Sequence, residues 1–249
     1  MTLAANLARI REKIAGACRI ANRPESDVAL MAVSKNHSAL AILEAYDAGL
    51  RLFGESRVQE WQQKLPALEH LFIPMQSDSP SAQEPAAHVH LIGPLQSNKT
   101  ARAAELFHAI DAVDSLKIAA RLDAAARALG TRLPILIEVK LSYEESKHGV
   151  LPAELPALLA GLAPLQGLIP AGLMTVPPWS EDPERAREYF RELRRLRDHS
   201  LAACPTLTQL SMGMSDDFAV AIQEGSTCIR IGTALFGRRQ YAAGAVRSE

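Results

Sequence analysis

The segment Val28-Ala29-Leu30-Met31-Ala32-Val33-Ser34-Lys35 is a short apolar run closed by a single lysine, and a helical pattern follows it at residues 38–48. An uninterrupted aliphatic run of this length predicts a buried strand over residues 28–34. A buried strand followed by a helix is the repeating unit of a parallel sheet. The segment therefore predicts an α/β fold, and the rest of the chain decides which one.

The same alternation of strand and helix continues to residue 231. The expected strands are residues 28–34, 51–54, 88–92, 109–113, 134–141, 168–174, 208–212 and 227–231. The expected helices behind the first seven strands are residues 38–48, 56–65, 97–107, 115–129, 152–161, 183–203 and 215–224. Eight such strands, preceded by an extra helix over residues 3–21, predict one closed (β/α)8 TIM barrel. A doubly wound open sheet is the alternative, but no GxGxxG motif opens the first unit, as a dinucleotide-binding version would require.

A single domain is expected to span residues 1–249, with the extra helix inside residues 1–22. Residues 74–87 are rich in Pro, Ser and Gln, and we interpret them as a flexible surface loop because the alternation resumes directly after them. Residues 238–249 show no core pattern and are expected to form a loosely held tail.

The composition disfavours several classes of function. The formal net charge is -1 and no long block carries one sign, which argues against nucleic acid or an anionic membrane as a partner. The basic stretch at residues 185–197 alternates with glutamates at helical spacing and is typical of a solvated helix face. The three cysteines lie far apart, which disfavours a disulfide framework or a structural zinc site. The sequence shows neither a signal peptide nor the run of about 20 apolar residues that spans a bilayer. A cytoplasmic protein is therefore expected, either a monomer or a weak dimer.

Small and polar residues gather behind the expected strands, at the end where barrels of this kind hold their functional sites. They are Lys35; Gly54, Glu55 and Ser56; Gly93, Gln96, Ser97, Asn98 and Lys99; Ser142 and residues 144–149; Met174 and Thr175; Ser211, Met212, Gly213, Met214 and Ser215; and Arg230, Ile231, Gly232 and Thr233. Each alone is compatible with ordinary turn chemistry. Their convergence on one end of the barrel predicts a binding site.

Lys35 is the leading candidate in this set. An ammonium at the tip of an apolar strand is partly desolvated, which favours the neutral amine, and a neutral amine condenses with aldehydes. The alternative is a solvated strand end or an ion pair, because buried lysines are rare. Glu55 could pair with Lys35 or tune its proton, although a glutamate at a strand end is more often structural or solvated.

The loops after the last two expected strands fit an anion. Gly213 permits close backbone approach, and Ser215 is expected to cap the helix over residues 215–224. Gly232 and Thr233 follow the eighth strand in the same way, and these two loops are the frequent phosphate site of such barrels. The alternative is a capped helix and a tight turn that bind no ligand.

Arg230 lies inside the otherwise apolar strand at residues 227–231. A guanidinium stays charged and is costly to bury alone. It is therefore expected either to pair with an acidic neighbour inside the barrel or to donate to the ring nitrogen of a heteroaromatic ligand. His148 is a weak candidate for a general base and Lys147 for a second amine, because such loop residues are usually at the surface. Lys99 is interpreted as a solvated lysine in the first turn of a helix.

Seven segments together closely resemble the pyridoxal phosphate homeostasis proteins, also called the YggS/PROSC family. They are residues 32–35 (AVSK), 53–60 (FGESRVQE), 90–99 (HLIGPLQSNK), 144–149 (EESKHG), 172–175 (GLMT), 210–215 (LSMGMS) and 230–233 (RIGT). They agree in order and spacing between about residues 30 and 237. The resemblance implies a barrel like the N-terminal domain of alanine racemase. It also implies pyridoxal 5'-phosphate bound covalently as an imine, a Schiff base, to Lys35.

The resemblance assigns roles to the other site residues as well. The implied cofactor-binding set is Lys35, Ser56, Ser211, Met212, Gly213, Ser215, Arg230, Ile231, Gly232 and Thr233. Within it, the resemblance implies that the phosphate is held by Ser211, Gly213, Ser215, Gly232 and Thr233 and that Arg230 faces the pyridine nitrogen. A guanidinium there keeps this nitrogen unprotonated and makes the ring a poorer electron sink. Ser56 stands where the family usually has asparagine. Pro94 stands where it often has histidine, so residue 94 is not expected to transfer protons.

These inferences favour a protein that binds, buffers or delivers pyridoxal phosphate to enzymes that use it, and they disfavour an enzyme. Related two-domain racemases place a tyrosine opposite the lysine from an appended β domain, and no room for such a domain is expected before Glu249. The first alternative is an amino-acid racemase or lyase that uses Lys35 as a base. The second is a barrel that binds only free phosphate or a sugar phosphate.

Overall fold

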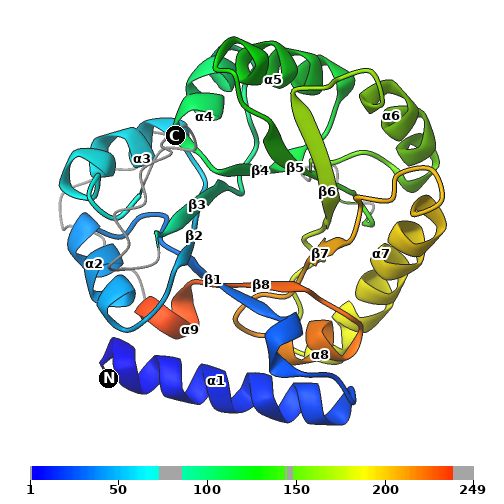
Figure 1. Cartoon of the computed structure of the whole chain (residues 1–249). Coiled ribbons are helices and arrows are strands. Elements are labelled where there is room, and N and C mark those ends of the chain that lie inside the picture. Colours follow the sequence, from blue (N-terminus) through cyan, green and yellow to red (C-terminus); the bar gives the residue numbers. More distant parts are fainter. Residues whose placement is uncertain (1, 73–85, 143, 145–147, 238–249) are drawn as a thin grey trace.

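Eight parallel strands close into a barrel in the computed structural model of the chain, which describes residues 2–72, 86–142, 144 and 148–237. The strand order follows the sequence, and β1 pairs with β8 to close the ring (Figure 1). The strands are β1 (Ala29–Val33), β2 (Leu52–Glu55), β3 (His88–Leu91), β4 (Ala109–Val113), β5 (Leu133–Glu138), β6 (Leu168–Met174), β7 (Gln209–Ser211) and β8 (Cys228–Ile231). The predicted (β/α)8 barrel is confirmed.

The helices form a ring outside the strands, as Figure 1 shows. They are α1 (Leu3–Ile20), α2 (Ala39–Asp47), α3 (Val58–Lys64), α4 (Thr100–Leu106), α5 (Leu116–Ala128), α6 (Leu155–Leu162), α7 (Arg187–Ser200), α8 (Phe218–Gln223) and α9 (Thr233–Phe236). Short 3-10 helices stand at Glu25–Asp27, Leu65–Ala67, Ser97–Lys99, Pro152–Glu154 and Pro183–Ala186. The extra helix α1 lies outside β1 and β8. There the Asn6 side chain donates a 2.9 Å hydrogen bond to the carbonyl of Leu235 in α9.

The main core lies between the strands and the helices. Ile135 and Ile137 of β5 are fully buried in it, whereas Leu136 between them joins a smaller apolar cluster with Ala112, Ala171 and Met174. This is the alternation of a strand that is covered on both faces. Each large apolar side chain removed from water in this way contributes about 1.5–3 kcal/mol to stability. The strands are therefore stabilised by the helices that pack on their outer faces. Their carboxyl ends are left available for polar side chains.

Two local features differ from the sequence expectations. Helix α8 begins at Phe218 rather than at residue 215, because the Asp217 carboxylate accepts a 2.6 Å hydrogen bond from the Met214 backbone N–H and holds residues 214–217 in a turn. The expectation that Ser215 caps this helix is therefore wrong. In addition, α9 follows the eighth strand, where no clear helix was expected. The expected tail at residues 238–249 and most of the expected loop at residues 74–87 lie outside the described residues.

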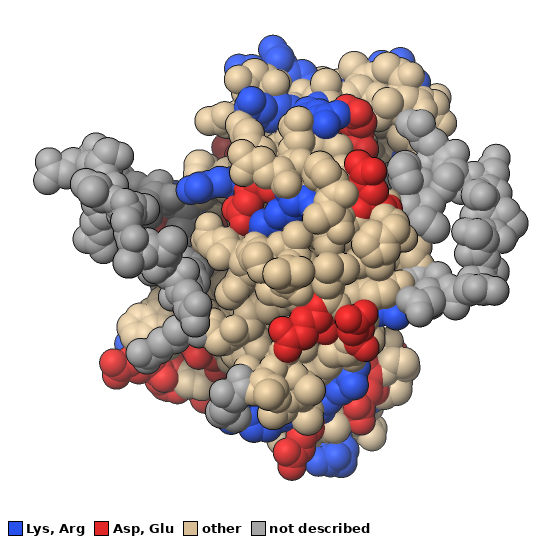
Figure 2. Space-filling view, turned by 90° about the vertical axis from the view of Figure 1, so that its left-hand side faces the viewer, with Lys and Arg blue, Asp and Glu red and all other residues tan. Residues whose placement is uncertain are grey.

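The surface over α2 and α3 carries acidic and basic side chains interspersed among uncharged ones, as Figure 2 shows for the part that grey atoms do not cover. This mixture agrees with the nearly balanced charge of the sequence. Within the described ranges, no helix has both the length and the apolar character needed to cross a membrane.

Candidate functional site

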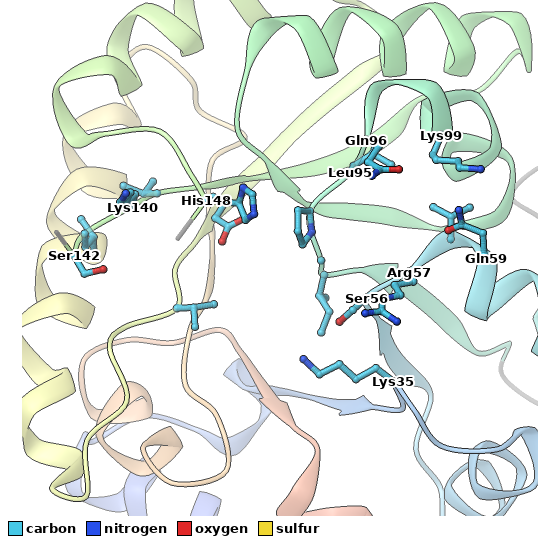
Figure 3. A pocket seen from close by; sticks show the side chains of 18 residues that line it. Lys35, Ser56, Arg57, Gln59, Leu95, Gln96, Lys99, Lys140, Ser142 and His148 are labelled. Carbon is cyan, nitrogen blue, oxygen red and sulfur yellow. The ribbon is translucent and has the colours of Figure 1, made fainter. Parts of the chain in front are cut away.

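Two neighbouring cavities open at the carboxyl ends of the strands, and three residues line both of them: Lys35, Ile92 and Val176. The larger cavity has a volume of about 800 Å³ and lies over β2, β3 and β5. The smaller cavity has a volume of about 280 Å³ and lies over β1, β7 and β8. Lys35 stands two residues after the end of β1 and is half-buried. Its amine extends into the open space between Ser56 on one side and His148 on the other (Figure 3).

The backbone on both sides of Lys35 is fixed by helix α3. The Lys64 ammonium, at the end of this helix, donates to the carbonyl of Ser34 at 3.0 Å. It also donates to Glu55 Oε1 at 2.8 Å and to Glu60 Oε1 at 2.7 Å. Glu60 in turn accepts a hydrogen bond from the backbone N–H of Asn36, a residue in the left-handed region with φ of 61°. The residues before and after Lys35 are thus held through one lysine and one glutamate.

Glu55 is the buried centre of this network. Its side chain is 0% exposed, and Oε1 accepts from the Ser34 hydroxyl at 2.7 Å as well as from Lys64. Burial raises the pKa of Glu55, and the Lys64 ammonium acts in the opposite direction. Glu55 therefore pairs with Lys64 and supports the backbone under Lys35, which is the structural role that the sequence favoured.

Replacing Lys64 by methionine is expected to lower the free energy of unfolding by about 3 kcal/mol, because the buried Glu55 carboxylate loses its partner. Urea denaturation of the two proteins measures this difference. The double variant Lys64→Met, Glu55→Gln is expected to recover part of the loss, because it no longer buries an unpaired charge. Glu60→Gln serves as the milder control, since Glu60 is less buried. A loss below about 0.5 kcal/mol for Lys64→Met, the range of ordinary surface substitutions, would contradict the assignment.

The smaller cavity is built mainly from the ends of β7 and β8. Ser215, Gly232 and Thr233 line it, and the Ser215 hydroxyl accepts a 3.2 Å hydrogen bond from the Ala234 backbone N–H at the start of α9. The Ser215 side chain thus joins the two loops that the sequence grouped together. Gly213, two residues before Ser215, has φ of 95°, and a Cβ at this position would lie 2.5 Å from the Cβ of Ala221. Only glycine allows the chain to turn this closely against α8.

Arg230 extends from β8 into the same cavity. It is 4% exposed, and it donates to the Ser211 hydroxyl at 2.7 Å and to the Thr175 carbonyl at 2.8 Å. Burial lowers the pKa of the guanidinium, and the nearby Cys228, Asp111, Glu138 and Asp217 act in the opposite direction. An arginine remains charged under any such shift. The side chain is therefore a fixed, cationic donor in the lining of the cavity.

Cationic side chains also predominate in the larger cavity. Arg57, Lys99 and Lys140 line it together with Lys35, and Glu138 is its one carboxylate among the described residues. Figure 3 shows Lys140 and Ser142 on the side opposite Arg57 and Lys99. Such a lining attracts anions. The weak candidate His148 lies at the edge of this cavity and is exposed. Lys147 lies outside the described residues.

Comparisons with known proteins agree over nearly the whole chain. Residues 5–240 match the family described as "Alanine racemase, N-terminal domain". A Pasteurella multocida protein named "Pyridoxal phosphate homeostasis protein" is 40% identical over 244 residues, which cover 97% of this chain and 100% of that protein. A Pseudomonas aeruginosa protein of the same name is 42% identical over 242 residues and covers 97% and 98%. The chain belongs to the pyridoxal phosphate homeostasis protein family.

A solved structure supports membership of the pyridoxal phosphate homeostasis protein family. PipY from Synechococcus elongatus, determined with PLP bound, is 40% identical to this chain and superposes with a TM-score of 0.80. The match covers 95% of this chain and 100% of that one. The resemblance that the seven sequence segments indicated is therefore confirmed.

Six of the ten family-derived site residues line the cavities, and four do not. The six are Lys35, Ser56, Ser215, Arg230, Gly232 and Thr233. One of the other four, Gly213, accepts the Arg230 backbone N–H at 2.9 Å through its carbonyl. Ser211 lies behind Arg230 and accepts its hydrogen bond. By contrast, the side chains of Met212 and Ile231 are fully buried in the main core, and the Met212 N–H donates to the Cys228 carbonyl at 3.1 Å. Neither of these two side chains belongs to the lining.

Sequence reasoning did not select His37, Asp216 or Val176, which also line the smaller cavity. The His37 ring stacks on Phe236 of α9, with centroids 4.7 Å apart. His37 lies two residues after Lys35, and Asp216 directly follows Ser215. Nearness to the selected residues was the available signal, but it does not tell which side chains of a loop face the cavity.

Proposed function

We propose that this chain binds pyridoxal 5'-phosphate on Lys35 and serves its homeostasis, buffering the cofactor or delivering it to apo-enzymes that depend on it. The observation that supports the proposal is the position of Lys35, which lines both the wide, cationic cavity and the smaller cavity formed by the loops after β7 and β8. Relatives that are about 40% identical bear the name of this function, and PipY has been determined with PLP bound.

The residues of the two cavities fit the parts of this cofactor. Ser215, Gly232 and Thr233 offer hydroxyl and backbone groups for the phosphate, and Arg230 offers a guanidinium for the ring nitrogen. When bound, the cofactor supplies an aldehyde, which condenses with an amine and releases water, and a ring that can accept electrons. The Ser56 hydroxyl lines the larger cavity at the opening.

Each residue then has a defined task. Lys35 supplies the nucleophilic amine, and Lys64 and Glu60 keep its backbone in place. Arg230 is held by Ser211 and Thr175, so it donates a hydrogen bond toward the ring without being able to accept a proton in return. A ring nitrogen that faces a guanidinium stays unprotonated, which weakens carbanion stabilisation. This chemistry favours holding the cofactor over turning substrates over.

The racemase or lyase alternative remains the second candidate, because the family match is to the N-terminal domain of alanine racemase. Such an enzyme needs a second acid–base group opposite the lysine. No tyrosine is among the described residues that line either cavity. The histidines of the linings are His37, whose ring is stacked on Phe236, and His148, which is exposed at the rim; the carboxylates are Asp216 and Glu138. None of them has a proton-transfer role assigned by the family resemblance. The carrier proposal is therefore preferred.

Absorbance and mass spectrometry test the proposal. The purified protein loaded with pyridoxal phosphate is expected to show a band near the edge of the visible range, which borohydride removes by reducing the imine. Peptide mapping is expected to place the reduced adduct on Lys35. A protein that binds inorganic phosphate but gives neither band nor adduct would overturn the proposal in favour of a plain phosphate-binding barrel.

A second assay separates carrier from enzyme. The loaded protein is incubated with L-amino acids in deuterated water, and D-isomers and α-deuterium are measured. We expect neither to accumulate above the buffer with free pyridoxal phosphate. Turnover that survives purification and disappears in the Lys35→Ala variant would establish the racemase or lyase instead.

A further inference from the structure

A third polar cavity lies at the opposite mouth of the barrel. It has a volume of about 230 Å³ and is lined by residues of β3, β4, β5, β6 and β7, including the first residues of β3, β4 and β7. Its polar lining is formed by His88, His90, His108, Asp111 and Gln209, and none of these lines either cavity around Lys35. His88 and Gln209 are exposed, so the cavity opens to solvent. The proposed cofactor site does not account for this cluster.

Asp111 is the residue that points to a ligand. It is 1% exposed, and its Oδ1 lies within hydrogen-bond distance of His90 Nδ1, at 3.0 Å. Its other oxygen, Oδ2, is buried and has no hydrogen-bond partner within the described part of the chain. A buried carboxylate oxygen without a donor is costly, so such atoms in folded proteins call for a partner. A ligand that brings an N–H donor satisfies this oxygen.

The rings of His88 and His108 provide a flat wall beside Asp111. The rings of His88 and His108 are stacked, with centroids 4.8 Å apart and planes 11° from parallel. His108 Nδ1 accepts the Val89 backbone N–H at 3.1 Å, so its neutral ring carries the proton on Nε2. Burial, followed by the charge of His90, lowers the pKa of His88 and favours its neutral form. No lysine or arginine is in the lining.

A metal ion is not the ligand that this geometry selects. Although histidine and aspartate are common metal ligands, no three His, Cys, Asp or Glu side chains of the described residues converge in a way that would hold one. Asp111 is the one carboxylate in a lining without lysine or arginine. The Arg230 guanidinium is near enough to interact with Asp111 electrostatically, but it does not hydrogen-bond to Oδ2. The outer face of the stacked imidazoles accommodates a planar group. These features together favour an organic cation.

We propose that the amino-terminal mouth of the barrel is a binding site for a small, planar organic cation with N–H donors, of the amidinium or imidazolium class. The cation donates to Asp111 Oδ2, and its plane lies against the outer face of the His88–His108 stack. The apolar remainder of the lining is Ala109, Pro134, Ile135, Leu136 and Ala171. This assignment does not depend on pyridoxal phosphate.

Benzamidine is the probe, and benzamide is its uncharged counterpart. A primary amine is unsuitable, because it would also react with an aldehyde bound at Lys35. Titration of the full chain, followed by the imidazole NMR signals of His88 and His108, is expected to show saturable binding of benzamidine. Benzamide is expected to bind at least about tenfold more weakly, a difference of about 1.4 kcal/mol.

Asp111→Asn removes the charge while it keeps the shape, and it is expected to weaken benzamidine binding at least about tenfold. The matched control Asp47→Asn, on the exposed side of α2, is expected to leave binding unchanged. Equal affinity of the native protein for benzamidine and benzamide would overturn the proposal, as would equal benzamidine affinity of the native and Asp111→Asn proteins. The comparison of benzamidine with benzamide needs only the native chain. It therefore tests the proposed cation site even if the Asp111→Asn variant does not fold.

Discussion

A Lys35→Ala variant is expected to lose the imine absorbance band of the complex with pyridoxal phosphate completely. Alanine has no nitrogen with which an aldehyde can condense, and the effect on covalent binding is therefore all or none. Some cofactor is expected to remain without a covalent bond, because Ser215, Thr233 and Arg230 still line the smaller cavity. Equilibrium dialysis with and without borohydride reduction separates the two forms of binding.

Two other lysines of the larger cavity provide matched controls. Lys99→Ala and Lys140→Ala each remove an amine from the same lining, and both variants are expected to keep the band. The circular dichroism spectrum of each variant checks that the barrel is intact. An imine that persists at full strength in Lys35→Ala, mapped to Lys99 or Lys147, would show that the assignment of Lys35 is wrong.

Arg230 variants are expected to produce the second large effect. The guanidinium is buried, and Asp111, Glu138 and Asp217 are near enough to influence its pKa. Arg230→Glu adds another carboxylate to this acidic surrounding and is expected to lower the free energy of unfolding by about 3–5 kcal/mol. Arg230→Gln keeps a donor without the charge and is expected to cost less. Urea denaturation gives both values.

The same variants test the contact with the cofactor ring. The absorbance of fully loaded Arg230→Gln is expected to differ from that of the native complex, because the charge beside the ring nitrogen is gone. The ratio of phosphorus to protein confirms the loading. An unchanged spectrum of a fully loaded variant would contradict the placement of Arg230 at the ring.

Much of the fold follows from local pattern alone. The apolar runs predicted the eight strands to within a few residues, because parallel strands that are buried on both faces leave long aliphatic segments. Lys35 was identifiable for the same reason, since a charged residue at the tip of such a run is conspicuous. The alternation of a strand could also have predicted that Ser211 and Met212 face different sides, because neighbouring residues of a strand point to opposite faces. Ser211 contacts Arg230, whereas Met212 is buried in the main core.

Long-range partners were not predictable in this way. Nothing in the helical pattern distinguishes Lys64 from a solvated lysine at a helix end, and its contacts with Ser34 and Glu55 exist only once α3 packs beside β2. The Ser215 hydroxyl was expected to cap its own helix, but Asp217 occupies that turn and leaves the hydroxyl for Ala234. In both cases the partner lies on a distant element of the chain, and three-dimensional packing brings it within reach.

The closure of the barrel by β1 and β8 has a consequence for the order in which the protein is made. Lys35 leaves the ribosome early, whereas Arg230 and Thr233 are among the last described residues to appear. A nascent chain therefore exposes the amine before it has the loops that would select a phosphorylated aldehyde. Under the proposed function, selectivity for a phosphorylated aldehyde needs the loops that come together when β8 docks on β1 and Asn6 of α1 meets Leu235 of α9. A chain released before β8 is made would then carry the lysine without the loops that select its ligand.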